Sequence, residues 1–207
     1  MTTGLFVAFD GPGGAGKSTT VAALAERLSA ERLPVTATTE PSREAIGQLA
    51  RVSTHTFSGL TLACLVTADR YHHLHTLIRP ALARGELVLC DRYTASSLVL
   101  QAGLDEVPEA FVRELNRFAE PPDLQVVLTA SAEELRTRLA ARGSHGRFED
   151  DPASAAQEVS LYERVTAQLT REGHVVEAVD TSPGVEQVVS HLADLIRALW
   201  SQGRAAA

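Results

Sequence analysis

Apolar runs alternate with segments of helical periodicity along most of this chain. The runs predict strands, and they cover residues 5–10, 87–91, 124–129 and 174–180, while a β-branched run predicts another strand at 35–39. Most of these runs are continuously apolar, a pattern that favours a parallel sheet covered on both faces over a sheet with one exposed face. The sequence therefore predicts the α/β class, with about five parallel strands and helices on both sides.

Helical periodicity fills the segments between these strands. Apolar residues between positions 21 and 28 recur at the spacing of one helix face. Residues 59–85 keep helical spacing for a long stretch, and Pro80 predicts that this helix bends or splits near the proline. Further helices are expected at residues 108–119, after the capping box Ser131-x-x-Glu134, up to about Arg171, and after Ser182-Pro183.

The glycine-rich segment GPGGAGKS, residues 11–18, follows the first predicted strand and precedes the first helix. It matches G-x-x-x-x-G-K-[ST], in which glycines let consecutive backbone N–H groups surround a phosphate at a helix N-terminus. In this pattern the lysine reaches the β- and γ-phosphates, and the serine hydroxyl binds Mg²⁺. The motif predicts a site for ATP and Mg²⁺ formed by Gly11, Gly13, Gly14, Ala15, Gly16, Lys17, Ser18 and Thr19.

Charged residues follow the other predicted strands. Asp91 ends the third strand, and we expect it to help hold Mg²⁺ together with Ser18. The carboxyl ends of parallel strands share one edge of a sheet, so residues near these ends should face a common ligand. Arginines are frequent beside these ends and around the polar segment 142–152, which is expected to be a loop. Arginine neutralises the charge of a transferring phosphoryl group, and this favours phosphoryl transfer.

Composition restricts the classes of function. The chain has 207 residues, enough for one domain, and its net charge of −7 argues against a nucleic-acid binder, which needs a basic face. No run approaches the ~20 apolar residues of a membrane span, and the N-terminus has no basic region of a signal peptide, so we expect a cytoplasmic protein. Cys64 and Cys90 are expected to be small buried residues, and His72 and His75 to lie on a polar helix face.

Taken together, the motifs resemble those of bacterial thymidylate kinases. The resemblance rests on FDGPGGAGKST, TTEPSREAIG, ADRYHHLHTLIRPAL, LCDRYTASSLVLQ, PPDLQVVLTA, RLAARGSHGRFE and VDTS, and it extends from about residue 5 to residue 196. Many folds share the phosphate loop, whereas DRYxxS preceded by ADR is more specific. The resemblance implies one P-loop NTPase domain over residues 1–207, with a lid at about residues 142–152. It also implies ATP-dependent phosphorylation of dTMP to dTDP by a homodimer.

The resemblance further implies roles for individual residues. Arg92 and Arg43 would clamp the acceptor monophosphate, and Arg70 would reach the edge of the base. Gly14 stands where one branch of the family has a loop arginine, so the lid would supply the catalytic arginine. The implied catalytic residues are Lys17, Asp91, Arg92, Arg142 and Arg147. The implied acceptor-binding residues are Asp10, Arg43, Val66, Arg70, Arg92, Ser96, Ser97, Leu100 and Gln101.

Four positions depart from the family pattern. The family usually has an acidic residue near the sugar hydroxyl where this chain has Gly13, and a phenylalanine that stacks on thymine where it has Val66. A polar group such as asparagine is replaced by Ser97, and an aromatic near the 2′ position of the sugar is replaced by Leu100. The phosphate machinery is retained while the base and sugar contacts are reduced. We therefore expect less efficient use of dTMP than in a usual thymidylate kinase.

Two other functions stay open at this point. A P-loop kinase that phosphorylates an alcohol, such as a nucleoside or a specialised metabolite, would need a general base, and Asp10 at the end of the first strand could serve. A nucleotide-dependent regulatory switch is less favoured, because a switch needs neither an arginine-rich lid nor a second-substrate clamp. The identity of the acceptor is the main question that the sequence leaves open.

Overall fold

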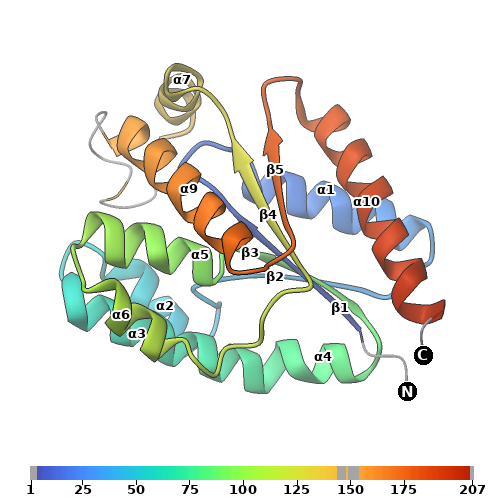
Figure 1. The fold of residues 1–207 in the computed structure, drawn as a ribbon, viewed down its shortest axis with the longest axis horizontal. Helices are drawn as coiled ribbons and strands as arrows, with labels where there is room; N and C mark the ends of the chain where they lie inside the picture. The colour runs from blue at the N-terminus through green and yellow to red at the C-terminus, as the bar shows by residue number, and fades with distance from the viewer. Residues whose placement is uncertain (1–3, 144–147, 149–153, 206–207) are drawn as a thin grey trace.

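The computed structural model describes residues 4–143, residue 148 and residues 154–205, and a five-stranded sheet lies at its centre (Figure 1). Every neighbouring pair of strands is parallel, in the order β2-β3-β1-β4-β5. The strands are β1 (Leu5–Asp10), β2 (Val35–Thr39), β3 (Leu87–Asp91), β4 (Leu124–Thr129) and β5 (Val176–Asp180). The predicted α/β class and its parallel sheet are confirmed, and only β5 begins later than expected.

The register of the strands places the carboxyl ends of β1, β2 and β3 side by side. Phe9 of β1 and Thr39 of β2 both pair with Asp91 of β3, so these strands end at the same edge. The chain runs from β1 to β2 and β3 on one side, and then to β4 and β5 on the other. The strand order therefore reverses at β1, and ligands of such sheets bind outside the carboxyl ends at this point.

Alternate side chains of the strands enter two separate cores. Val7 and Phe9 pack with apolar residues of α1 (Lys17–Ala30) and α10 (Val185–Ala205) on one face. Phe6 and Ala8 pack on the other face (Figure 1). This face is covered by the segment from α3 (Gly59–His73) to α4 (Arg79–Ala83), by α5 (Thr94–Ser97) and by α9 (Ser154–Arg171). Because both faces are covered, the three central strands β3, β1 and β4 are almost continuously apolar and buried, whereas the edge strands β2 and β5 are only partly buried.

The remaining helices follow the predicted periodicity with local differences. They are α2 (Ala45–Val52), α3 (Gly59–His73), η1 (Leu74–Ile78), α4 (Arg79–Ala83), α5 (Thr94–Ser97), η2 (Leu98–Leu104), α6 (Glu109–Leu115), α7 (Ala132–Arg142) and α9 (Ser154–Arg171). The predicted helix over 59–85 is divided by the π-helical turn η1, and Pro80 lies in the first turn of α4, where proline is tolerated. The capping box at Ser131 and Glu134 is formed.

The cysteine prediction is half right. Cys90 is buried in β3, but Cys64 is exposed, because it lies on the outer face of α3 while its neighbour Ala63 is buried. His75 is exposed and His72 half-buried, as the polar helix face requires, whereas His73 between them is buried. In the described part of the chain, no helix has both the length and the apolar composition that a membrane crossing requires.

Candidate active site

The glycine-rich loop has a backbone that only glycine adopts easily. Gly11 has a φ of +146°, and a Cβ there would lie 2.2 Å from the carbonyl oxygen of Leu128 in β4. Gly16, the residue before α1, has a φ of +86°. These conformations bring the loop close to β4 and turn it into the N-terminus of α1, as the phosphate-loop motif predicts.

Lys17 is the first residue of α1, and it is buried at the mouth of the loop. Its Nζ donates hydrogen bonds to the carbonyl oxygens of Gly11 at 2.7 Å and Pro12 at 2.8 Å. Burial, followed by the nearby charge of Arg92, lowers the pKa of Lys17 to about 8, although surrounding carboxylates oppose the shift. The ammonium group is therefore still mainly charged at neutral pH. Its hydrogen bonds hold the Lys17 side chain against the carbonyl oxygens of the phosphate loop.

Ser18 and Asp91 form a pair of oxygen donors beside the loop. The Ser18 hydroxyl donates to Oδ2 of Asp91 at 2.5 Å, which joins α1 to the end of β3. The other carboxylate oxygen, Oδ1, is buried and has no hydrogen-bond partner among the described residues. Carboxylate and hydroxyl oxygens are the ligands that Mg²⁺ prefers. The donor set and the unsatisfied oxygen together fit the predicted Mg²⁺ site.

A cavity of about 240 Å³ opens in front of this loop. Its lining combines the phosphate loop with residues of the β2–α2 connection, α3, the α5–η2 segment and α9. The sequence-predicted residues in the lining are Gly14, Gly16, Lys17, Ser18, Thr19, Val66, Arg70, Asp91, Arg92, Ser96, Ser97, Leu100 and Gln101. The predicted residues that do not line it are Asp10, Gly11, Gly13, Ala15 and Arg43. The side chain of Arg142 and all of Arg147 lie outside the described residues.

Asp10 is placed to stabilise the fold and is not placed as the general base that the alcohol-kinase alternative needs. It is fully buried, and Oδ1 accepts hydrogen bonds from the backbone N–H groups of Tyr93 at 3.1 Å and Ser96 at 2.9 Å, and from the Ser96 hydroxyl. Oδ2 accepts a hydrogen bond from Nε2 of Gln125 at 3.0 Å. Both oxygens are engaged, so Asp10 joins β1 to the start of α5 and to β4. This geometry gives the alternative no support.

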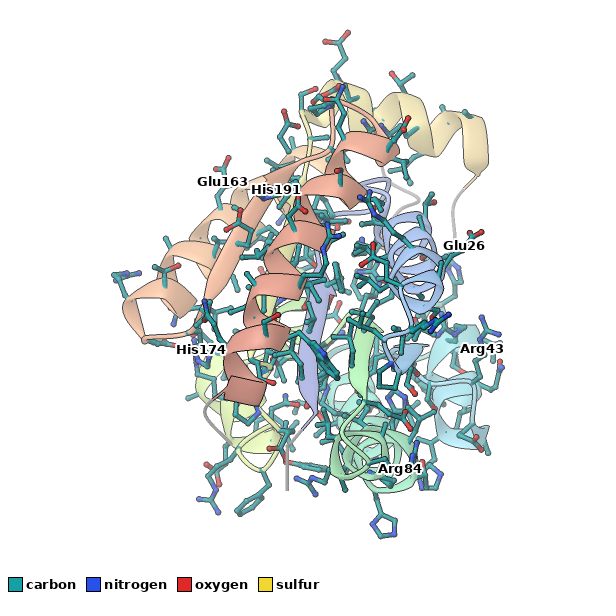
Figure 2. All side chains as sticks on the ribbon, turned by 90° about the vertical axis from the view of Figure 1, so that its right-hand side faces the viewer. Glu26, Arg43, Arg84, Glu163, His174 and His191 are labelled. Atoms are coloured by element: carbon teal, nitrogen blue, oxygen red, sulfur yellow. The ribbon has the colours of Figure 1, made fainter. Side chains whose placement is uncertain are left out.

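Two arginines follow β2, and the structure places only one of them in the cavity. Arg43 is exposed and lies at the outer surface beside α2 (Figure 2). Arg51, on the last turn of α2, lines the cavity and donates a hydrogen bond to the carbonyl of Pro41. Burial lowers the pKa of Arg51, while Asp91 raises it and Arg92 lowers it. Arg51 therefore interacts electrostatically with the groups that end β3.

Arg70 is held by a buried network at the far side of the cavity. Its Nε donates to Glu40 at 2.7 Å, and Nη1 donates to Ser97 at 3.1 Å and to Asn116. Burial alone would lower the pKa of Arg70, but Glu40 and the other groups around it raise the pKa overall. The guanidinium is fixed in one orientation, because a buried ion pair with hydrogen bonds on several sides leaves it little freedom.

The Glu40 carboxylate is also close to His73. Nδ1 of the His73 ring lies 3.3 Å from Oε1 of Glu40, and Nε2 lies 2.7 Å from the Thr38 hydroxyl. Glu40, His73 and Cys90 form the single group of three potential metal ligands found within the described ranges. Since Glu40 is paired with Arg70 and both His73 nitrogens have hydrogen-bond partners, this group is part of the polar core.

Glu158 reaches the phosphate loop from α9. Its Oε2 accepts a hydrogen bond from the backbone N–H of Gly13 at 3.0 Å, and the side chain is 3% exposed. A carboxylate from a distant helix thus lies beside the position where this chain lacks an acidic side chain. The cavity-lining residues that the sequence analysis did not single out include Glu40, Arg51, Tyr93, Phe148 and Glu158. Three of these lie in motifs that carry the family resemblance: Glu40 in TTEPSREAIG, Tyr93 in DRYxxS and Phe148 in RLAARGSHGRFE. Arg51 and Glu158 had no sequence signal.

The fold and this cavity define a class of protein. A parallel sheet with a phosphate loop, a carboxylate at the end of β3, and a second group of arginines across one cavity are features of a P-loop phosphotransferase with a separate acceptor site. The loop and the acceptor side share Arg92, which lies between them at the end of β3.

Comparison with known proteins identifies the family. The family model described as thymidylate kinase matches residues 9–192. The chain is 37% identical over 200 residues to the thymidylate kinase of Pseudomonas syringae pv. syringae, covering 92% of this chain and 95% of the relative. It is 35% identical over 210 residues to that of Pseudomonas fluorescens, covering 98% and 99%, and 32% identical over 208 residues to that of Caulobacter vibrioides, covering 95% and 97%. The chain belongs to the thymidylate kinase family, and it is a phosphotransferase of the nucleoside monophosphate kinase type.

Proposed function

We propose that this chain transfers the γ-phosphoryl group of ATP to dTMP, giving dTDP and ADP. The observation that supports this most directly is the shared cavity, which has the phosphate loop at one end and the fixed guanidinium of Arg70 at the other. The names of the relatives point to the same reaction. A nucleotide hydrolase or a regulatory switch would need only the end of the cavity that contains the phosphate loop.

At the donor end, the loop backbone and Lys17 would bind the β- and γ-phosphates of ATP. Ser18 and Asp91 would hold Mg²⁺, which when bound offsets the negative charge of these phosphates. Lys17 would exchange its hydrogen bonds to Gly11 and Pro12 for bonds to phosphate oxygens. The positive end of the α1 dipole adds to this attraction.

At the acceptor end, we assign the monophosphate of dTMP to Arg51 and Arg92, with Arg51 in place of the expected Arg43. Arg70 and Ser97 would bind the edge of the base, because their hydrogen-bonded pair faces the cavity. An oxygen of the acceptor phosphate attacks the γ-phosphorus, and the bond to the β–γ bridging oxygen breaks, releasing ADP. The attacking oxygen is already anionic, so the step needs positioning and charge neutralisation rather than a general base. A homodimer in the cytoplasm remains part of the proposal on the resemblance alone.

An acceptor screen tests this function. With ATP and Mg²⁺ we expect dTMP to be converted to dTDP, while thymidine and other nucleosides are not phosphorylated. Phosphorylation of a nucleoside but of no monophosphate would support the alcohol-kinase alternative instead. ATP hydrolysis at a rate that does not depend on any acceptor would point to a regulatory switch. The comparison should include dUMP and other monophosphates, because the base contacts of this chain are reduced.

The substitution Val66→Phe is expected to improve the use of dTMP. Val66 is half-buried in α3 and lines the cavity, and phenylalanine there would provide a stacking face without adding charge. Stacking of a base on an aromatic side chain contributes roughly 1–3 kcal/mol, so kcat/KM for dTMP should rise about tenfold. The matched control is Val185→Phe at the exposed start of α10, which should change nothing. A fall in kcat/KM in folded Val66→Phe would mean that Val66 is a packing residue.

A further inference from the structure

Asp69 is a fully buried carboxylate that the proposed reaction does not use. It lies on α3 directly before Arg70, and its side chain contacts the connection between β2 and α2. Oδ2 accepts a hydrogen bond from the backbone N–H of Ser42 at 2.5 Å, and Oδ1 accepts one from the Ser42 hydroxyl at 2.6 Å. A buried carboxylate needs such partners, and here both of these bonds come from a single residue.

The adjacent α3 residues Asp69 and Arg70 thus fix the short segment 40–42, which connects β2 to α2. Arg70 binds Glu40, Asp69 binds Ser42, and the cavity-lining Pro41 lies between these two attachments. Because each attachment is buried, the segment cannot move without breaking a charge-assisted hydrogen bond. The position of Pro41 is therefore set from α3.

Ser42 in turn fixes the position of α2. A Cβ added to Gly47 would lie 2.3 Å from the carbonyl oxygen of Ser42 and 2.6 Å from its hydroxyl, so the helix backbone packs directly against this residue. The Ser42 hydroxyl also accepts a hydrogen bond from the N–H of Glu44, the residue before the helix, at 3.1 Å. A shift of Ser42 would be transmitted to α2 because no flexible side chain lies between them.

Arg51 is on the last turn of α2, and it also donates to the carbonyl of Pro41. The backbone of Arg51 is thus held through α2 and Ser42, and its side chain is held by Pro41. Both belong to, or depend on, the segment 40–42 that Asp69 fixes. Burial is the largest effect on the pKa of Arg51 and lowers it, while the charge of Asp69 is among the effects that raise it. The carboxylate therefore acts on this arginine through the backbone and also through its field.

We propose that Asp69 is a positioning residue for the phosphoryl acceptor, acting through Ser42 and α2 to place Arg51 in the cavity. The proposal rests on the proposed function, in which Arg51 binds the acceptor monophosphate. It makes Asp69 specific for the acceptor, because the hydrogen bonds of Asp69 run to Ser42, whereas the donor side depends on the phosphate loop and β3.

Steady-state kinetics with dTMP and ATP test the proposal. Asp69→Ala should raise KM for dTMP at least about tenfold and leave KM for ATP within about twofold. Asp69→Asn should recover most of the loss, because its amide can accept from the Ser42 N–H and donate to the hydroxyl. Gly47→Ala, which forces α2 away from Ser42, should reproduce the increase in KM for dTMP. This variant replaces Asp69→Ala as the test if Asp69→Ala does not fold. The matched control is Asp123→Ala, which removes a carboxylate that accepts from the Phe6 N–H at 2.7 Å and should leave KM for dTMP unchanged.

A double-mutant cycle separates positioning from a general structural effect. In an Arg51→Ala background, Asp69→Ala should raise KM for dTMP no further than about twofold, because the arginine that it positions is already absent. A full tenfold effect in that background overturns the proposal, as does an equal rise of both KM values in the single variant. An Asp69→Asn variant as defective as Asp69→Ala also overturns it.

Amide hydrogen exchange gives a readout that needs no acceptor. Asp69→Ala should accelerate exchange across residues 42–52 while β1 and β4 keep their protection. Unchanged exchange in this segment overturns the inference even if the protein phosphorylates dTMP. If the wild-type chain does not use dTMP, the proposed function fails, whereas accelerated exchange would still show that Asp69 fixes α2.

Discussion

The variant Lys17→Met should lose phosphoryl transfer almost completely, with kcat reduced by at least about 10³-fold, and should still fold. The buried ammonium group lies at the mouth of the phosphate loop, where it would face the transferring group. Removing one preorganised charge of this kind from a site costs about 10²–10³ in rate, and a lysine that contacts the phosphates of ATP directly should lie at or beyond the top of that range.

Folding of this variant should be preserved because Lys17 is costly to bury. Its pKa falls from the usual 10.5 to about 8, so the charged form is disfavoured in the folded protein. That shift corresponds to roughly 3 kcal/mol, and methionine avoids this cost while leaving two loop carbonyls without their donor. The cost applies below pH 8 and is relieved as the pH rises from about 8 to 10.5, so any stability advantage of the variant should shrink over that range.

Single-turnover rates and thermal unfolding, measured together across this pH range, check the expectation. For the wild type, kcat/KM for ATP should fall above about pH 8 as Lys17 loses its proton, and the variant should lack this step. Near-normal turnover by a folded Lys17→Met protein would contradict the nucleotide site as a whole. A variant that is inactive because it is unfolded would be recognised by its lost thermal transition.

The strands could be predicted because their environment is uniform. Residues such as Val7, Leu89 and Val126 are buried whatever their exact neighbours, so a continuous apolar run is enough to indicate them. A division of 59–85 near Pro80 was predicted, but its π-helical form was not, since helical periodicity is kept across η1. The exposure of Cys64 depends on which face of α3 meets α2 and the core, and composition does not determine this.

The lining of the candidate site could be predicted where it is local in sequence. Lys17 and Ser18 follow from the loop spacing, and Asp91 and Arg92 follow from the end of a buried strand. Arg51 was missed because its place depends on α2, whose register against Ser42 is set by the tertiary contact of Gly47. Glu158 was missed for the same reason, since 145 residues separate it from the Gly13 N–H that it binds.

The second large effect is expected at Arg92, where Arg92→Gly and Arg92→Ala should reduce kcat equally and by about 10³-fold or more. The side chain lines the cavity beside Lys17 and Asp91, where a guanidinium would stabilise charge on the transferring group. An arginine in this role contributes about 10³–10⁵ in kcat. Both variants remove the same guanidinium, so the chemical step should not distinguish them.

Their stabilities should differ, because Arg92 has a φ of +70°, in the left-handed region. Its backbone is fixed there by a hydrogen bond from its N–H to the Phe9 carbonyl at 2.7 Å and by one from the Cys90 thiol to its own carbonyl at 3.2 Å. Glycine adopts this conformation without the ~1–2 kcal/mol that an alanine incurs. Urea unfolding should therefore find Arg92→Gly more stable than Arg92→Ala by about 1 kcal/mol, with matching kcat losses. If KM for dTMP rises while kcat is unchanged in both, Arg92 only binds the acceptor. If kcat instead follows stability, the loss reflects the backbone and not the missing charge.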